Sequence, residues 1–266
     1  MENFITSKGN SNIKLFQKLV SSKKARDEHN MFPLEGMRLV CDAISENLEL
    51  HCVFIVESYE EKYGEALNLL KNKNLESLVF YITDELSNKL SDTMNPQGIY
   101  AICKKLDKKL NADTILDNGK YIILNNLQDP GNIGAIIRTA DAVGISGIAL
   151  TENCCDIYNS KVIRSTMGSL FRMNLWLDCS FDMALDAFKS KGIATYAAVI
   201  DTDATSLTEC DFSKGTVVVI GNEGNGLPKE IVDLCDNKLT IKMNGNINSL
   251  NAAMATGIIM WEMFRQ

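Results

Sequence analysis

The sequence predicts an α/β fold in which parallel strands form a buried sheet with helices on both faces. Short runs of β-branched and aromatic residues, typical of buried strands, alternate along the chain with segments that have the apolar spacing of helices. Asn- and Gly-rich turns follow several of these runs, as is common where strands end in layered α/β proteins. A polar, charged stretch over residues 104–120 separates two such series, so two domains are expected.

The first series occupies residues 1–104 and is expected to form the smaller α/β domain, followed by a linker over 105–118. Residues 11–28 are predicted to form one helix, because Ile13, Phe16 and Leu19 recur at helical spacing. The other elements expected here are helices at 39–44 and 67–70 and strands at 53–56, 79–82 and 99–102.

The second series occupies residues 119–266 and is expected to form the larger domain. Its predicted strands lie at 121–124, 148–150, 194–199 and 217–220, and its predicted helices at 133–142, 183–190 and 249–264. The last helix is apolar on more than one side, since Ile258, Trp261 and Phe264 accompany a second apolar row. We expect its own domain to cover one face and a second copy of the chain the other; complete burial within its own domain is the alternative.

The charge of the chain does not by itself suggest a nucleic-acid partner. The 266 residues include 27 Lys and Arg against 34 Asp and Glu, a formal net charge of −7. A basic surface can still be local. Residues 1–40 hold seven basic side chains against four acidic ones, so the N-terminal end is the expected basic surface.

The cysteines indicate a reducing compartment rather than a metal site. None of the eight forms a Cys-x-x-Cys pair, and only two histidines are present to help bind a metal, so no metal is expected. We see no signal peptide and no apolar run of membrane-spanning length. A cytoplasmic protein with no membrane association is therefore predicted.

Three Asn- and Gly-rich segments follow predicted strands and could carry chemistry. The first runs from Asn125 to Gly134 and is followed by Arg138. It leads into a helix whose first amides can meet an anion, and Asn132 is the expected N-cap. A capped helix with a solvated Arg138 is the alternative interpretation.

The second segment follows the strand at 217–220 and reads Gly-Asn-Glu-Gly-Asn-Gly over residues 221–226. Its glycines allow a close backbone approach to a ligand, and Glu223 is its one acid. The segment lacks the Gly-Lys-Ser/Thr ending of a phosphate loop, so a nucleotide-dependent enzyme is only weakly supported. A plain strand-to-helix turn remains open.

The third segment spans residues 241–251 and enters the last helix. Ser249 is the expected N-cap of that helix, and Ser249 and Asn251 supply small hydrogen-bonding groups near its N-terminus. Any capped amphipathic helix would have the same appearance, so this segment alone does not establish a site.

Together, these segments resemble in order and spacing the three signature motifs of the SpoU (TrmH) family of SPOUT RNA 2′-O-ribose methyltransferases. The similar segments are 129–140, 221–227 and 249–255, with 161–168 resembling the family's intermediate segment. Residues 5–102, which include Asn95-Pro96-Gln97-Gly98, resemble the family's small ribosomal-protein-like substrate-binding domain. Lys242, Asn248 and Ser160 depart from the family pattern, which often has a proline, an acid and a proline there.

The resemblance implies a trefoil-knotted α/β domain, a homodimer with shared active sites, and S-adenosylmethionine as the cofactor. The cofactor contacts that it implies are Gly221, Gly226, Ile241, Met243 and Leu250. The positions matching the family's catalytic and RNA-site residues are Asn132, Arg138, Glu223, Ser249 and Asn251. The further RNA contacts expected are Arg164 with the basic residues Lys14, Lys23, Lys24 and Arg26.

The implied reaction is attack of a ribose 2′-oxygen on a sulfonium methyl. Family accounts make the arginine of the first motif the base, but a guanidinium normally stays protonated far above neutral pH. We therefore expect Arg138 to grip a phosphate and stabilise the developing alkoxide, with Glu223 holding its orientation. The alternative is that Arg138 is the base, which requires burial and neighbouring groups to make its guanidinium give up a proton far more readily. The N-terminal domain favours 23S ribosomal RNA as substrate. Transfer RNA, or a non-catalytic RNA-binding protein of the same fold, are the alternatives.

Overall fold

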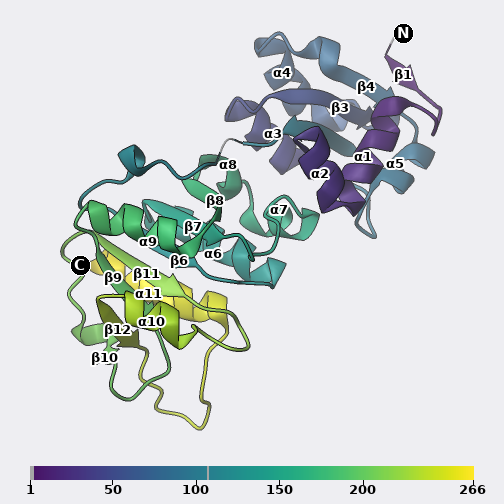
Figure 1. The fold of residues 1–266 in the computed structure, drawn as a ribbon. Helices are drawn as coiled ribbons and strands as arrows, with labels where there is room; N and C mark the ends of the chain where they lie inside the picture. The colour runs from purple at the N-terminus through teal and green to yellow at the C-terminus, as the bar shows by residue number, and fades with distance from the viewer. Residues whose placement is uncertain (1–2, 107) are drawn as a thin grey trace. The chain divides into compact units, whose positions relative to one another are not determined.

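The computed structural model describes residues 3–106 and 108–266, which form two compact α/β units. Unit 1 comprises the chain up to residue 106 together with Tyr158–Phe171. Unit 2 comprises Lys108–Ile157 and Arg172–Gln266. Each unit has its own sheet, and Figure 1 labels many of the helices and strands.

Unit 1 is built on a mixed five-stranded sheet in the order β1-β4-β3-β5-β2. Strands β1, β4 and β3 are parallel, whereas β5 runs antiparallel to both β3 and β2. The elements are β1 (Phe4–Ile5), α1 (Ser11–Ser21), α2 (Lys23–His29), β2 (Met31–Glu35), α3 (Met37–Ser45), β3 (Leu50–Val56), α4 (Gly64–Asn72), β4 (Val79–Ile82), α5 (Asp84–Leu90), β5 (Ile99–Lys104) and α7 (Ser160–Thr166), with short 3-10 turns η1 (Glu57–Tyr59), η2 (Glu61–Tyr63) and η3 (Glu76–Leu78).

Unit 1 differs from the sequence prediction in several elements, β1 and α5 among those not foreseen, and two of the differences have a clear physical cause. The single helix expected over residues 11–28 is wrong, because Ser22 is extended (φ −138°, ψ 118°) and its side chain caps α2 by accepting from the Ala25 N–H. Strand β2 was not foreseen, since Pro33 argues against a central strand. The proline is tolerated because β2 lies at the edge of the sheet, where one side of the backbone needs no ladder bonds.

Unit 2 contains a seven-stranded sheet in the order β10-β12-β9-β11-β6-β7-β8, and every pairing in it is parallel. This confirms the expected parallel α/β architecture. Its elements are η4 (Ala112–Thr114), β6 (Lys120–Leu124), α6 (Pro130–Val143), β7 (Gly147–Thr151), β8 (Leu175–Cys179), α9 (Phe181–Ser190), β9 (Ala194–Ala198), β10 (Thr205–Ser206), η5 (Leu207–Glu209), β11 (Thr216–Ile220), α10 (Lys229–Leu234), β12 (Asn237–Thr240) and α11 (Ala252–Arg265). The short helix α8 (Ser169–Arg172) spans a boundary between the two units.

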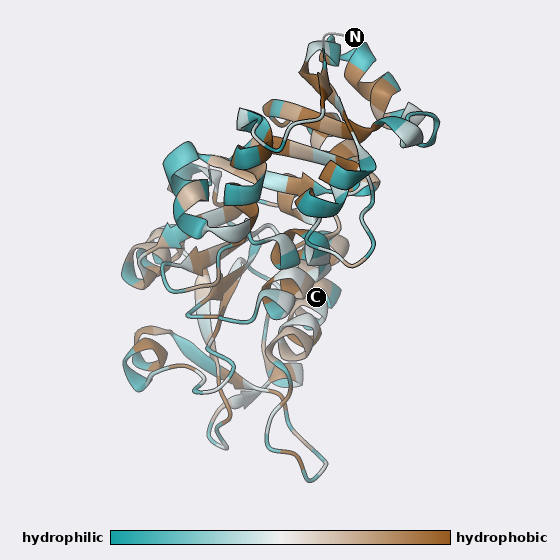
Figure 2. Cartoon of the chain, turned by 90° about the vertical axis from the view of Figure 1, so that its right-hand side faces the viewer, coloured by the Kyte–Doolittle hydropathy of each residue, from teal (hydrophilic) through white to brown (hydrophobic). Residues whose placement is uncertain are grey.

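The two faces of the unit 2 sheet are covered by different helices. Tyr121, Ile123 and Val219 face a buried cluster that includes α9, while side chains of α10 pack at its margin. Because side chains alternate along a strand, Ile122 and Val218 face the opposite side, where α6 and α11 lie against each other. Many strand residues are coloured hydrophobic in Figure 2, whereas many helical residues are coloured hydrophilic.

Strands β8, β10 and β12 were also missed by the sequence analysis. In β12 only Leu239 is buried, so the segment has no apolar run to signal a strand. Within residues 3–106 and 108–266, no helix is long and apolar enough to cross a membrane.

We predict that Phe188→Ala destabilises unit 2 strongly. The Phe188 ring is fully buried and packs with Tyr121 and Trp176, at ring-centroid distances of 4.9 Å and 5.9 Å. Truncation leaves a cavity and should cost about 3–5 kcal/mol of unfolding free energy, measured by chemical denaturation. The control Met183→Ala lies on the same helix and is 66% exposed, so it should change stability by no more than about 0.5 kcal/mol. Equal effects would contradict this packing.

Candidate functional site

The first Asn- and Gly-rich segment connects β6 to α6. Pro130 starts the helix, and Asp129 is its N-cap, with its Oδ1 accepting from the Asn132 N–H at 2.9 Å. The prediction that Asn132 caps this helix is therefore wrong. Proline is favoured at the first helical position, so the helix already starts at Pro130, nearer the N-terminus than expected. As a result, the Asn132 side chain lies in the first turn and is buried.

The second segment forms a tight loop after β11. Asn222 and Gly226 exchange backbone hydrogen bonds of 3.1 Å and 2.9 Å, and Gly226 has φ +65°. A Cβ on Gly221 would lie 2.3 Å from the backbone carbon of Gly226. Glycine is thus required at both ends of the loop, for different reasons. At Gly221 the backbone of Gly226 approaches too closely for a Cβ, and at Gly226 the backbone is left-handed.

The third segment enters α11, and here too the predicted cap is wrong. Ser249 does not cap the helix, which begins three residues later at Ala252. Asn251 is the N-cap: its Oδ1 accepts from the N–H groups of Ala253 and Met254 at 2.9 Å and 3.2 Å. This leaves the Nδ2 of Asn251 available as a donor.

A chain of side-chain hydrogen bonds joins the three segments. The Asn251 Nδ2 donates to the Asn132 Oδ1 at 2.9 Å, and the Asn132 Nδ2 donates to the Glu223 Oε1 at 3.1 Å. Segments that are 91 and 119 residues apart in sequence therefore meet at one point. The three residues were each predicted as site residues, and the structure brings them together.

Glu223 is the acceptor at the end of this chain. Its Oε1 also accepts from the Asp129 N–H at 2.9 Å, and its Oε2 accepts from the Gln128 N–H at 3.1 Å. Partial burial acts to raise the pKa of Glu223, but the hydrogen bonds from Asp129, Asn132 and Gln128 outweigh it and hold the pKa below its ordinary value. The acid is thus kept ionised at neutral pH.

Arg138 lies apart from these bonds. It is exposed on α6, and within residues 3–106 and 108–266 it makes no hydrogen bond or ion pair. The expectation that Glu223 orients Arg138 is therefore wrong for this structure, because both carboxylate oxygens are engaged by amide donors. The guanidinium remains available to a ligand.

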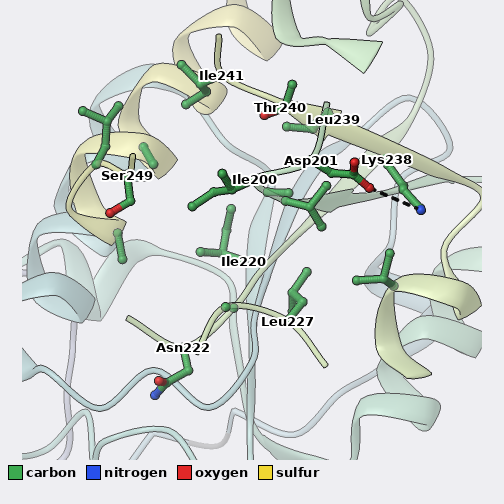
Figure 3. Close-up of a pocket in the computed structure, with 18 of the residues that line it drawn as sticks. Ile200, Asp201, Ile220, Asn222, Leu227, Lys238, Leu239, Thr240, Ile241 and Ser249 are labelled. Atoms are coloured by element: carbon green, nitrogen blue, oxygen red, sulfur yellow. Dashed lines mark ion pairs between the residues drawn. The ribbon is translucent and has the colours of Figure 1, made fainter. Parts of the chain in front are cut away.

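A cavity of about 690 Å³ opens at the ends of β9, β11 and β12. Figure 3 shows side chains from these strand ends and from the start of α11 pointing into it. All five predicted cofactor contacts line this cavity, and so do Ser249 and Glu223. The five are Gly221, Gly226, Ile241, Met243 and Leu250. Because Glu223 belongs both to the cavity wall and to the amide chain, the cavity and the chain form one site.

Sequence reasoning missed the part of the cavity that follows β9. Ile200 and Asp201 line it, together with Lys238 of β12. These residues form no motif, and the strand β12 that positions Lys238 was not itself foreseen. Within the described part of the chain, no group of three or more His, Cys, Asp or Glu could hold a metal ion.

The predicted RNA contacts in unit 1 differ in their surroundings. Lys14, Lys23 and Lys24 are exposed on α1 and α2. Arg26 is buried, and its Nη1 donates to the carbonyls of the α1 C-terminus, so its prediction as a phosphate contact is wrong. Arg164 is part of an ion pair with Asp92, at 3.2 Å between Nη1 and Oδ2.

The chain matches two described protein families. The SpoU rRNA methylase family matches residues 119–261, and the MRM3-like substrate binding domain matches residues 10–101. An uncharacterized tRNA/rRNA methyltransferase of Synechocystis is 30% identical over 262 residues, covering 98% of this chain and 93% of that protein. A 23S rRNA (guanosine(2553)-2′-O)-methyltransferase of Bacillus subtilis is 28% identical over 97% of this chain and 98% of its own length.

A solved structure is similar over nearly the whole length of the chain. It is an AdoMet-bound rRNA methyltransferase from Sinorhizobium meliloti, 29% identical, with a TM-score of 0.85 over 98% of this chain and 97% of that one. The fold, the three converging segments and the cavity at their meeting point therefore have a common explanation: the chain belongs to the SpoU rRNA methylase family.

Proposed function

We propose that this protein transfers a methyl group from S-adenosylmethionine to a ribose 2′-hydroxyl of 23S ribosomal RNA. The observation that carries the proposal is the hydrogen-bonded chain of Asn132, Glu223 and Asn251, whose Glu223 lies on the wall of a cavity lined by the predicted cofactor contacts. The B. subtilis relative, whose name specifies 2′-O-methylation of 23S rRNA and which matches along both chains, supports the choice of RNA.

The cavity fits a cofactor of this kind in size and chemistry. About 690 Å³ lies within the usual range of small-molecule sites, which is roughly 300–1,000 Å³. Its walls combine apolar side chains such as Ile220 and Ile259 with the glycine-rich backbone at 221–226. Apolar walls can receive an adenine ring, and exposed backbone amides and carbonyls can recognise its polar edge. The bound cofactor supplies an activated methyl on a sulfonium.

The protein's own task is to present a weakly acidic hydroxyl to that methyl. We assign to Arg138 the grip on an RNA phosphate and the stabilisation of the developing alkoxide, since its guanidinium has no protein partner in the described residues. Glu223 acts as a positioning residue: it fixes the 128–132 turn and, through Asn132, the N-terminus of α11. Ser249, on the cavity wall, can donate or accept a hydrogen bond at the reacting end.

We also propose that the protein is a homodimer that pairs through the exposed face of α11. One face of α11 is buried in unit 2, through Ile259, Met260 and Met263. The other face presents a row of large apolar side chains, 42–64% exposed, at positions 254, 258, 261 and 264. A row of this kind, rich in aromatic and Met side chains, is typical of the core of a subunit interface. Arg138 lies on α6 beside this helix, so pairing through α11 would bring it toward a partner copy.

We also propose the domain organisation and the RNA contacts that the sequence suggests. The substrate-binding domain spans residues 1–104, a linker 105–118, and the methyltransferase domain 119–266 with its trefoil knot. Lys14, Lys23 and Lys24, exposed on α1 and α2, are the proposed phosphate contacts of the first domain. The protein acts in the cytoplasm.

We predict that Arg138→Ala abolishes methyl transfer but leaves cofactor binding intact. Arg138 does not line the cavity, whereas removing a charge-assisted contact at the reacting group commonly costs about 10²–10³-fold in rate. Transfer of tritiated methyl into a 23S rRNA transcript measures the rate, and calorimetry with S-adenosylhomocysteine measures binding. Arg138→Lys should restore little activity, because an ammonium lacks the planar fork that grips a phosphate. Near-normal transfer by the alanine variant would remove Arg138 from the mechanism.

Glu223→Gln should reduce the transfer rate by about 10–100-fold, as loss of supporting hydrogen bonds around a site commonly does. The carboxylate offers only acceptors to three amide donors, whereas a glutamine places its own NH₂ against one of them. The pKa of Glu223 is lowered in the folded protein. The contribution of its charge to holding the site together is therefore complete above the ordinary glutamate pKa and is lost only in stronger acid.

The ratio of wild-type to Glu223→Gln rates should therefore stay constant from pH 5 to pH 8. Glu230→Gln serves as the matched control, since this acid lies on α10 outside the cavity wall. A ratio that falls toward one at pH 5 would show that Glu223 is protonated there and that the amide donors do not hold its charge.

Trp261→Glu should convert the dimer to a monomer and abolish transfer. Trp261 is 57% exposed at the centre of the apolar row on α11, where a buried charge would oppose association. Sedimentation velocity at low micromolar concentration gives the mass of each form. Met183→Glu, on the exposed side of α9, should leave the dimer and the activity unchanged. A wild-type monomer with full activity would rule out the dimer and the shared site.

A further inference from the structure

An ion pair on the cavity wall takes no part in the proposed contacts with RNA or in the amide chain of Glu223. The Asp201 Oδ2 and the Lys238 Nζ lie 3.7 Å apart, and both residues line the cavity. Their side chains are 36% and 44% exposed, so the pair is partly open to solvent. In Figure 3 the pair lies across the cavity from Ser249 and Asn222.

Both charges are held in place by the fold. The Asp201 Oδ1 accepts from the Asp203 N–H at 3.0 Å, a local turn that fixes the carboxylate. Lys238 belongs to β12, where it lies opposite Ala197 of β9. Lys229 and Asp233 of α10 also line the cavity, but within the described residues neither forms an ion pair. Asp201 and Lys238 are thus the one paired set of opposite charges on this wall among the residues that the structure describes.

The chemistry of this pair favours one part of the proposed cofactor. An adenine ring placed over it would strip water from two charges without replacing their hydrogen bonds, which is unfavourable. The ring belongs instead against apolar side chains such as Leu239 and Ile259. A ribose diol could use the carboxylate but has no need of the ammonium. An amino-acid zwitterion offers both charges side by side and matches both members of the pair.

We propose that Asp201 and Lys238 bind the amino-acid tail of the cofactor and determine its recognition as an amino-acid sulfonium rather than a plain nucleoside. The Asp201 carboxylate accepts from the α-ammonium, and the Lys238 ammonium donates to the α-carboxylate. The proposal rests on the proposed use of S-adenosylmethionine. It places the methionine tail at the end of the cavity that holds Asp201 and Lys238 and leaves the side near Ser249 and Glu223 for the methyl and the RNA.

Calorimetry with two ligands tests this assignment on the full-length protein. S-adenosylhomocysteine carries the amino-acid tail, whereas 5′-methylthioadenosine has the same base, ribose and thioether without it. Asp201→Asn keeps the oxygen that accepts from the Asp203 N–H, and Lys238→Met keeps most of the aliphatic stem. Each substitution should weaken S-adenosylhomocysteine binding about tenfold, the loss expected for one charge-assisted contact. Binding of 5′-methylthioadenosine should stay unchanged, which also reports that the cavity is intact.

Asp203→Asn is the matched control, because this acid lies on the same loop but outside the cavity wall, and it should alter neither affinity. Equal weakening of both ligands would assign the pair to the nucleoside and overturn the proposal, as would unchanged binding of S-adenosylhomocysteine in both variants. If the wild-type protein binds neither ligand, the proposed function fails and this inference fails with it. If the wild type binds both and only the variants behave unexpectedly, the proposed function stands and the tail assignment alone is wrong.

Discussion

The site depends on a single carboxylate. Glu223 collects three amide donors from the turn after β6 and so ties that turn to the loop after β11. One of these donors, Asn132, also accepts a hydrogen bond from Asn251, the N-cap of α11. The start of α11 is therefore held to the same turn. Without an acceptor at this point, the loop after β11, the turn after β6 and the start of α11 would not be held together, and the cavity wall to which Glu223 belongs would lose its shape.

Because Glu223 is bonded to amide groups, Arg138 does not depend on it for an ion pair. The sequence suggests an ion pair between Glu223 and Arg138, but an arginine already paired would have to break that pair before gripping RNA. In the structure the charged carboxylate is stabilised by hydrogen bonds from neutral amide groups, while Arg138 stays exposed on α6. Negative and positive groups of the site therefore perform different tasks: one shapes the protein, and the other faces the substrate. The separation also suits a chain that is acidic overall and must still attract phosphate locally.

How far the sequence could predict this arrangement depends on the type of signal. The strands β6, β7, β9 and β11 are buried on both faces and therefore appear as apolar runs, so they were found. The Gly- and Asn-rich segments could be identified because their residue types are required by close backbone approach and capping. The sequence analysis could also place these segments on the same side of the sheet, because the carboxyl ends of parallel strands lie together.

What the sequence could not predict was set by tertiary context. Ser22 interrupts a helical pattern because it caps a second helix, and Pro33 is tolerated because its strand is at an edge. The helix starts at Pro130 and Ala252 depend on which side chain reaches the first free amides, which spacing alone does not determine. Asp201 and Lys238 are 37 residues apart and meet only through the pairing of β9 with β12.

The most direct test of the account is a map of ribose 2′-O-methylation in total RNA from cells with and without this protein. Methylated riboses resist alkaline cleavage of the adjacent phosphodiester, so each site is read as a protected position. The account predicts that one ribose in 23S ribosomal RNA is protected only when the protein is present. Unchanged protection throughout the ribosomal RNA, or a change confined to transfer RNA, would contradict it.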